Sequence, residues 1–277
     1  MLTTGLARTL GPANEAEVAR VLASDPVANC LVAARFEQAR MDARGLGGQF
    51  WGVSGGRDGV CFDGPNLVPL SGDKHSLKAF AQLASRTGRR CASILGSAEL
   101  VLPLWDRLES RWGEAREVRA DQPLLACTER VQCAADPLMR PVQPEEFEAY
   151  FPAAVAMFTE EVGVDPRWPD GGIGYRARVR ELIAGGRSFA RFEDGKVVVK
   201  AEIGALSTRA GLIQGVWVAP EHRGRGLAAP AVATLVQYVQ SLRRIPSLYV
   251  NAHNTAARAA YQRVGFRQVG TFASVLF

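Results

Sequence analysis

Lysine is nearly missing from this sequence. Of its 33 basic residues only four are lysines, at positions 74, 78, 196 and 200, and the other 29 are arginines. This skew, together with abundant alanine and glycine, indicates a GC-rich bacterial genome. The sequence also lacks a lysine-rich tail and a basic patch interleaved with aromatic residues, so it does not favour nucleic-acid binding. The net charge of +5 is compatible with an anionic small ligand, with a nucleic acid, or with solubility alone.

Long apolar stretches and paired cysteines are missing as well. Residues 1–17 have no apolar core of the signal-peptide type, and no run approaches the roughly 20 apolar residues of a membrane span. The five cysteines are odd in number, form no CxxC pair and all precede residue 134. We therefore expect reduced thiols in a cytoplasmic protein, with no metal site and no thiol nucleophile in the second half.

The length and hydropathy of the chain point to two domains. It has 277 residues, 47% of them hydrophobic, and a mean hydropathy of -0.02. In the second half, periodicity and turn residues predict strand, helix, helix, three strands, helix, strand, helix, strand. The first half predicts nearly the same order, and the duplication rests on that order alone. We expect an α/β (α+β) protein with domains at 1–133 and 138–277, joined by a linker near 129–137.

The expected elements are delimited by caps, glycines and prolines. In the first half we expect strands at 5–10, 49–54, 59–71, 91–97 and 117–128, helices at 13–24, 26–39, 76–88 and 98–113, and a glycine-rich turn at 54–58. In the second half we expect strands at 137–143, 188–195, 196–206, 210–218, 247–252 and 266–277, and helices at 144–161, 174–186 and 254–265, with a further helix ending near 243. Asp194-Gly195 predicts the turn of a hairpin.

The stretch VWVAPEHRGRGLAAPAVATLV, residues 216–236, joins a strand to a helix through Arg223-Gly224-Arg225-Gly226. A helix N-terminus presents unpaired N–H groups and partial positive charge, so phosphate binds there readily. Glycine allows close approach and positive φ, and arginine adds charge and fork-shaped donors. The turn predicts a pyrophosphate cradle that is neither a Walker loop nor a dinucleotide GxGxxG turn. The alternative is a glycine turn with solvated arginines.

The sequence on either side of this turn adds to the pattern. Gly215 interrupts the incoming strand, which suggests a bulge or a close backbone approach. About 30 residues after the turn, Asn254 and Tyr261 lie seven residues apart in a helix, on one face and about 10 Å apart along the axis. Arg258 lies close to that face, and Gly265-Phe266 follows.

In these two blocks, VWVAPEHRGRGLA and NTAARAAYQRVGF, the chain resembles the GCN5-related N-acetyltransferase (GNAT) family. The resemblance covers roughly residues 138–277. The first half is similar to the degenerate N-terminal GNAT-like domain of some bacterial tandem members. The resemblance implies two tandem domains, each a mixed, mostly antiparallel twisted sheet flanked by helices. It also implies acetyl-CoA as co-substrate.

The resemblance assigns roles to matching residues. Backbone amides would hold the pyrophosphate at Arg223, Gly224, Arg225, Gly226, Leu227 and Ala228. The backbone of Val216, Trp217 and Val218 would bind the pantetheine arm, and an N–H there would polarise the thioester carbonyl. Asn254 would hydrogen-bond the arm, and Tyr261 would protonate the departing thiolate. Two alternatives stay open: Tyr261 as a packed helix residue, and Arg258 in a surface contact instead of at a CoA phosphate.

The general base is the main departure from the family pattern. Many members carry a glutamate on the strand before the turn, where this chain has only Gln214. The substitutes are Glu202, whose alternative role is a salt bridge with Lys200, the terminal carboxylate of Phe277, and Glu160 or Glu161. The chain also stops one strand early, and the N-terminal half could cover the open edge.

The function expected from these features is acetyl transfer to a primary amine of a small molecule or peptide, by direct attack. The alternatives are a non-catalytic acetyl-CoA sensor and an RNA-associated protein. The sequence names neither the acceptor nor the oligomeric state.

Overall fold

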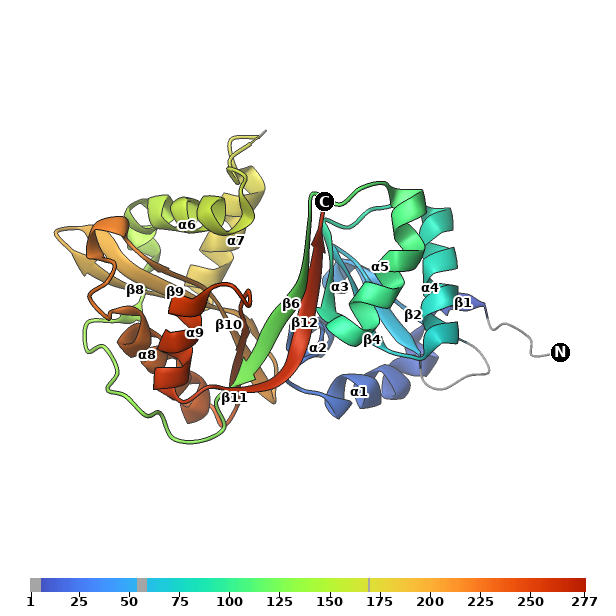
Figure 1. The fold of residues 1–277 in the computed structure, drawn as a ribbon, viewed down its shortest axis with the longest axis horizontal. Helices are drawn as coiled ribbons and strands as arrows, with labels where there is room; N and C mark the ends of the chain where they lie inside the picture. Colours follow the sequence, from blue (N-terminus) through green and yellow to red (C-terminus); the bar gives the residue numbers. More distant parts are fainter. Residues whose placement is uncertain (1–5, 54–58, 169) are drawn as a thin grey trace.

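The chain forms one continuous mixed sheet in a computed structural model that describes residues 6–53, 59–168 and 170–277. The strand order is β1-β2-β3-β4-β5-β12-β6-β11-β10-β9-β8-β7. The β4–β5 and β10–β11 pairs are parallel and the other neighbours are antiparallel. Helices cover the sheet in both halves (Figure 1). The expected α/β (α+β) class, with a mostly antiparallel sheet flanked by helices, is confirmed.

The first half follows the expected order with two differences. Its elements are β1 (Ala7–Thr9), α1 (Glu15–Ser24), α2 (Cys30–Ala39), α3 (Ala43–Leu46), β2 (Gln49–Val53), β3 (Val60–Asp63), β4 (Asn66–Ser71), α4 (Lys74–Thr87), β5 (Ser93–Ser97), α5 (Ala98–Trp112) and β6 (Glu117–Ala126). The stretch 59–71 is two strands, because Gly64-Pro65 breaks it, and the short α3 was not expected. The predicted turn at 54–58 lies outside the described residues.

The second half has the predicted order of elements throughout. They are β7 (Arg140–Pro141), α6 (Phe147–Val162), α7 (Ile173–Ala184), β8 (Ser188–Glu193), β9 (Lys196–Leu206), β10 (Ala210–Val218), α8 (Ala228–Ser241), β11 (Ile245–Tyr249), α9 (Thr255–Val264) and β12 (Arg267–Leu276). The hairpin turn has positive φ at both Asp194 (49°) and Gly195 (74°), as a two-residue turn between twisted strands requires.

The two halves exchange strands at the centre of the sheet. Strand β6, from the first half, pairs with both β11 and β12. Strand β12, from the second half, pairs with both β6 and β5. Figure 1 shows these two long strands between the halves. The N-terminal half thus supplies the strand beside β11, where the second half by itself would have an unpaired edge. As a result, the two sheets expected from the sequence form a single sheet.

Successive side chains of a strand point to opposite faces of the sheet, so each half of the molecule has one core on each face. In the first half, Trp51 packs with α4 and α5, whereas its neighbour Phe50 packs with α1 and α2. In the second half, Val199, Ala201 and Ile203 face α8 and α9. Helices α6 and α7 cover the opposite face. A smaller cluster packs α2 against β9 and β10, which joins the halves a second time.

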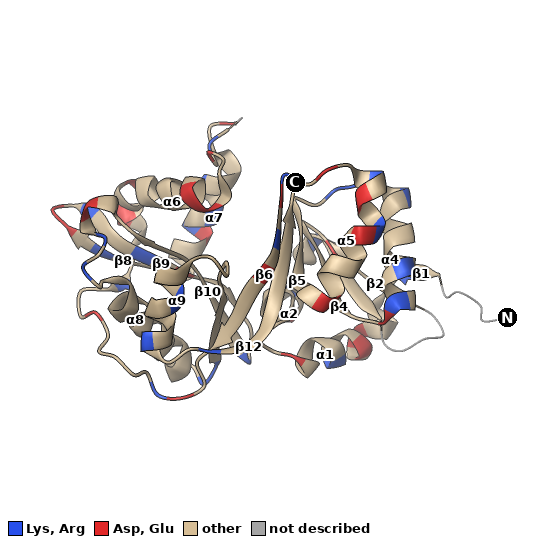
Figure 2. Cartoon of the chain, viewed as in Figure 1, with Lys and Arg blue, Asp and Glu red and all other residues tan. Residues whose placement is uncertain are grey.

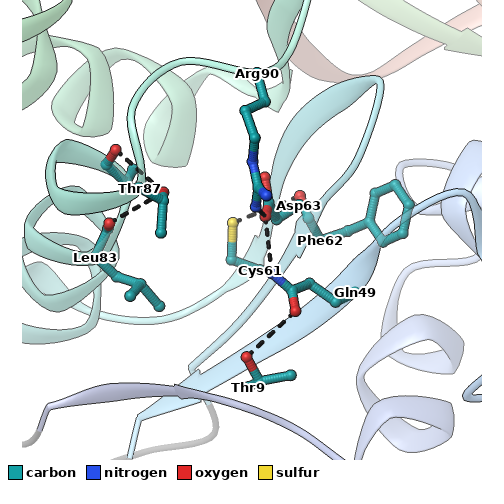
Figure 3. A network of polar contacts seen from close by, with 9 residues as sticks. Thr9, Gln49, Cys61, Phe62, Asp63, Leu83, Thr87 and Arg90 are labelled. Carbon is teal, nitrogen blue, oxygen red and sulfur yellow. Dashed lines mark hydrogen bonds and ion pairs between the residues drawn. The ribbon is translucent and has the colours of Figure 1, made fainter. Parts of the chain in front are cut away.

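A polar network links the strands of the first half near their edge (Figure 3). Arg90 Nη2 lies 2.9 Å from Asp63 Oδ2, and Gln49 Nε2 donates to the same oxygen at 3.1 Å. The hydroxyl of Thr9 donates to Gln49 Oε1 at 3.3 Å. These contacts tie β1, β2 and β3 to the segment before β5, so they support the fold of this half.

The cysteines and charges agree with a protein that has reduced thiols and a mixed surface. All five cysteines are free, and four of them are buried. Figure 2 shows basic and acidic residues interspersed along both halves. No helix in the described ranges has both the length and the apolar character that a membrane span needs.

Candidate active site

The turn before α8 is an open cradle of backbone amides. Gly224 and Gly226 both have φ of +75°, a conformation that side chains rarely adopt. No atom lies within 4 Å of where a Cβ would stand at either glycine. Among the described residues, the backbone N–H groups from Gly224 to Ala228 have no hydrogen-bond partner. The cradle therefore offers several free donors at the positive end of a 14-residue helix.

The strand that leads into this cradle is bulged and separates from its neighbour. The register of β10 on β9 shifts between Gln214 and Trp217, at Gly215, whose φ is +58°. The predicted bulge is therefore present. The parallel pairing of β10 with β11 ends at Leu212 and Ser247. Beyond that point the sheet opens between β10 and β11, beside the backbone of 216–218.

The side chains of the opened strand alternate across the sheet. Val216 and Val218 pack with the core under α8 and α9. Trp217 packs with the core under α6 and α7, and its Nε1 donates to Glu160 Oε1 at 3.1 Å. Arg223 Nη2 lies 2.7 Å from Glu160 Oε2, and Arg223 Nε donates to the Val218 carbonyl at 3.0 Å. Glu160, at the end of α6, thus holds the first residue of the cradle motif.

Helix α9 carries the three residues singled out after the cradle. The Asn254 side chain caps the helix by accepting from Ala257 N at 3.0 Å, which leaves its NH2 group free to donate. Arg258 is exposed and donates to the Ala252 carbonyl at 3.0 Å. This contact is a local one, to the loop just before α9.

Tyr261 is buried in the core under α8 and α9, and its ring lies 6.0 Å from that of Phe266. Among the described residues its hydroxyl has no hydrogen-bond partner. Burial, and secondarily the charge of Glu161, raises the pKa of Tyr261 above the ordinary tyrosine value. The phenol therefore stays protonated near neutral pH, as a proton donor must.

Glu202 lies in a buried ion pair. Its carboxylate is 2.8 Å from Lys200 Nζ and accepts from the Tyr150 hydroxyl at 2.8 Å. The two ionised residues are 3% and 0% exposed. Burial would raise the pKa of Glu202, but the charge of Lys200 and hydrogen bonds from Lys200, Tyr150 and Gln214 lower it overall. This is the salt bridge that the sequence offered as the alternative, and a carboxylate so stabilised is a weak base.

The terminal residue Phe277, one of the base candidates, packs into the core of the first half. Its ring packs against Trp105 and Trp112, with centroids 5.6 and 5.7 Å away. Tyr249, at the open end of β11, is opposite Leu124 on β6, whereas Leu276 is opposite Glu117. The exchange of β12 into the other half therefore places the end of the chain beside Arg116, whose N–H donates to the Leu276 carbonyl at 2.8 Å and whose side chain donates to the Val162 carbonyl at the end of α6.

Two arginines at the start of β6, Arg119 within the strand and Arg116 just before it, reach the same region from the first half, and the sequence did not single them out. Arg119 Nη2 donates to the Glu161 carbonyl at 2.7 Å, and Arg116 Nη1 donates to the Val162 carbonyl at 2.6 Å. Glu117 holds the Arg119 guanidinium through two hydrogen bonds. Their only signal in the sequence is the charged start of an otherwise apolar strand, which does not indicate the partner.

The equivalent turn of the first half is closed by its own side chain. Asp73 caps α4 and accepts from His75 N at 3.1 Å and Ser76 N at 3.0 Å. A Cβ at Gly72 would stand 2.6 Å from the Ser76 side chain. A carboxylate thus occupies the place that an anion would take, which leaves the second half with the open cradle. Within the described residues, no group of three His, Cys, Asp or Glu side chains could hold a metal ion.

Comparison with known proteins agrees with this geometry. A model described as the acetyltransferase (GNAT) family matches residues 147–266, and a domain of unknown function (DUF4081) matches residues 48–150. No protein of curated function matches the chain significantly.

Solved structures share the fold over the whole chain. A GNAT-family acetyltransferase from Colwellia psychrerythraea has 15% identity and a TM-score of 0.56, covering 98% of this chain and 99% of its own. A GCN5-related N-acetyltransferase from Sphaerobacter thermophilus has 18% identity and a TM-score of 0.61, covering 100% and 96%.

A third structure has two such units in one chain. It is a tandem GNAT protein from the clavulanic acid biosynthesis pathway, with 14% identity and a TM-score of 0.50, covering 98% of this chain and 98% of its own. The family model falls on the half that carries the open cradle, and the fold matches extend through both halves. Residues 147–266 belong to the GNAT family, and the chain as a whole shares the fold of these structures, one of them a tandem GNAT protein.

Proposed function

We propose that this chain is an acetyl-CoA-dependent N-acyltransferase that acetylates a primary amine of a small molecule or peptide, with its site in the second half. The observation that carries the proposal is the open edge of β10 running directly into an open amide cradle. The match of residues 147–266 to the GNAT family supports acetyl transfer in general. The proposed domain boundaries remain 1–133 and 138–277, and β6 of the first domain pairs with β11 and β12 of the second.

The residues present fit acetyl-CoA. A Cβ at Gly224 or Gly226 would occupy the space from which a phosphate would meet the cradle amides, and that space is open. Arg223 and Arg225 stand beside it as exposed cations. The unpaired edge at 216–218 offers backbone groups to the amide-containing pantetheine arm. When bound, the thioester supplies the acetyl group.

The chain's own residues then have separate tasks. The cradle amides hold the phosphates, and the NH2 group of Asn254 donates to the arm. A backbone N–H of the opened strand polarises the reacting carbonyl. Tyr261, kept protonated by its buried position, gives a proton to the leaving sulfur. The amine attacks directly, without a covalent intermediate on the enzyme.

Acetyl-CoA binding measured by calorimetry tests the site. Gly226→Asp places a carboxylate at the phosphate position, and we expect affinity to fall more than about tenfold. Gly88→Asp is the matched control, because Gly88 has φ of +74°, nothing within 4 Å of its Cβ position, and a place in the other half. Equal affinity in both variants would overturn the cradle assignment.

A second function, an acetyl-CoA sensor that transfers nothing, is favoured by one observation. The nearest acid to the bulge, Glu202, is neutralised by Lys200. Release of CoA thiol on adding a panel of primary amines separates the two functions. Release of CoA thiol that depends on an added amine supports the transferase. Tight binding of acetyl-CoA without thiol release for any amine of the panel supports the sensor.

A further inference from the structure

The Glu161 carboxylate lies in this region without a partner among the described residues. Its neighbours are all engaged: Glu160 with Trp217 and Arg223, Glu202 with Lys200, and Glu117 with Arg119. The Glu161 side chain is exposed, and among the described residues its carboxylate makes no hydrogen bond and no ion pair. An ionised group in this position is available to a ligand.

The last turn of α6 places Glu161 over the opening in the sheet. One turn earlier on the same helix face, Met157 Cε would stand 3.0 Å from a Cβ at Gly215, the bulge of β10. Glu160 reaches Trp217 on β10, and the Glu161 carbonyl accepts from Arg119 on β6. Since β6 lies on the far side of β11, this turn bridges the gap that opens where β10 and β11 separate.

The charged and titratable groups around Glu161 come from five elements. Although solvent reaches the Glu161 side chain, protein atoms crowd around it, and the resulting loss of hydration raises the pKa of its carboxyl above the ordinary glutamate value. The negative charge of Glu202 adds to this, whereas Arg119 and Lys200 act to lower the pKa. Three tyrosines respond to the charge of Glu161, namely Tyr175 on α7, Tyr249 on β11 and Tyr261 on α9. Burial first, and then Glu161, raises the pKa of Tyr249 to about 12. The tyrosines are therefore neutral near pH 7, and Glu161 is the group that can exchange a proton.

We propose that Glu161 binds the ammonium form of the acceptor amine and takes its proton. This inference rests on the function proposed above. An N–H bond of the ammonium breaks with its electron pair left on nitrogen, the proton passes to a Glu161 oxygen, and the carboxyl later returns it to water. A raised pKa suits this task, because a general base works best when its pKa is near the working pH.

The same geometry gives the first half a part in the site. Arg119 and Arg116 hold the two last carbonyls of α6, so they fix the turn that carries Glu161. Arg119 is half-buried and is itself oriented by Glu117. These arginines are positioning residues, because they act on the acceptor only through the placement and pKa of Glu161.

A carboxyl titration tests the base without needing the natural acceptor. In 13C-glutamate-labelled full-length protein, the Glu161 resonance is identified by its loss in Glu161→Gln. We expect it to titrate above the ordinary value of about 4.3, and we expect n-propylammonium to lower that pKa. Glu148, an exposed glutamate of the same helix, serves as the internal control. A Glu161 pKa at or below the ordinary value, or one indifferent to n-propylammonium, overturns the proposal.

The second experiment measures turnover. Primary alkylamines serve as acceptors, and the rate is followed by the release of CoA thiol from acetyl-CoA. We expect Glu161→Gln to lower kcat/KM by about 10²–10⁴-fold and to remove its acidic limb, with acetyl-CoA affinity unchanged by calorimetry. Glu148→Gln removes the same charge from the same helix and keeps wild-type rates. Full activity in Glu161→Gln overturns the base. Loss of acetyl-CoA binding in the wild-type protein would instead contradict the proposed function.

Discussion

Lys200 Nζ lies 2.8 Å from Glu202 Oε1 and donates to the Gly215 carbonyl at 3.2 Å, so one buried ammonium joins an ion pair to the bulge of β10. The pair lies on the sheet face covered by α6, where Tyr150 completes it. The bulge opens the strand edge beside the cradle. The internal ion pair therefore supports the shape of the site and leaves proton transfer to other residues.

Lys200→Met should destabilise the fold strongly. It leaves the Glu202 charge buried without its partner, and breaking a buried pair in this way costs about 3–5 kcal/mol. Urea unfolding followed by circular dichroism measures the change. Glu148→Gln, which removes an exposed partner of Arg176, should change the free energy of unfolding by less than about 1 kcal/mol. Equal effects in the two variants would mean that the buried pair contributes no more than a surface one.

The same pair predicts a pH dependence of stability. The pKa of Glu202 is lower in the folded protein than its ordinary value. Its contribution to the free energy of unfolding is therefore full above the unfolded pKa of about 4.3 and is lost as the pH falls through the folded pKa. The stability difference between wild type and Lys200→Met should shrink below about pH 4. A difference that stays constant down to pH 3 would contradict this assignment.

Tyr261→Phe should lower kcat by about 10²–10⁴-fold, the usual effect of losing a general acid. The ring contact with Phe266 survives and only the hydroxyl is lost, so acetyl-CoA affinity should not change. Stopped-flow thiol release and calorimetry measure the two quantities. An equally fast variant would show that Tyr261 only packs the core under α8 and α9.

Glu160→Gln should strengthen acetyl-CoA binding, because the carboxylate holds Arg223 and repels an arriving phosphate. The effect should be small, at most about fivefold, since the two side chains are about half exposed and such pairs are worth about 0–1 kcal/mol. Calorimetry at low and high salt measures it. Weaker binding in the variant would instead mean that Glu160 orients Arg223 for the ligand.

The fragment 138–277 should fail to fold as a monomer. It lacks β6, which fills the place between β11 and β12. Fragment 114–277 contains that strand and should be the more ordered of the two. Circular dichroism and size-exclusion chromatography compare them. Cooperative unfolding of monomeric 138–277 would show that β6 is dispensable.

Local sequence was enough to predict the shape of the turn before α8. Gly224 and Gly226 adopt positive φ because glycine has no Cβ, and the helix that follows begins where its apolar period begins. Gly215 marked the bulge and Asp194-Gly195 the hairpin for the same reason. The order of elements in the second half also followed, since apolar period and caps act over a few residues.

Long-range pairing decided the rest. Strand hydrogen bonds use backbone groups that every residue has, so nothing in the composition of β6 says that it will lie beside β11, more than a hundred residues away. That exchange packed Phe277 into the core of the first half and brought Arg119 to the last turn of α6. Glu160, Glu161 and Glu202 look alike in the sequence. Only tertiary packing distinguishes them. Glu160 pairs with Arg223 of the cradle, Glu161 is left without a partner among the described residues, and Glu202 is buried in an ion pair with Lys200.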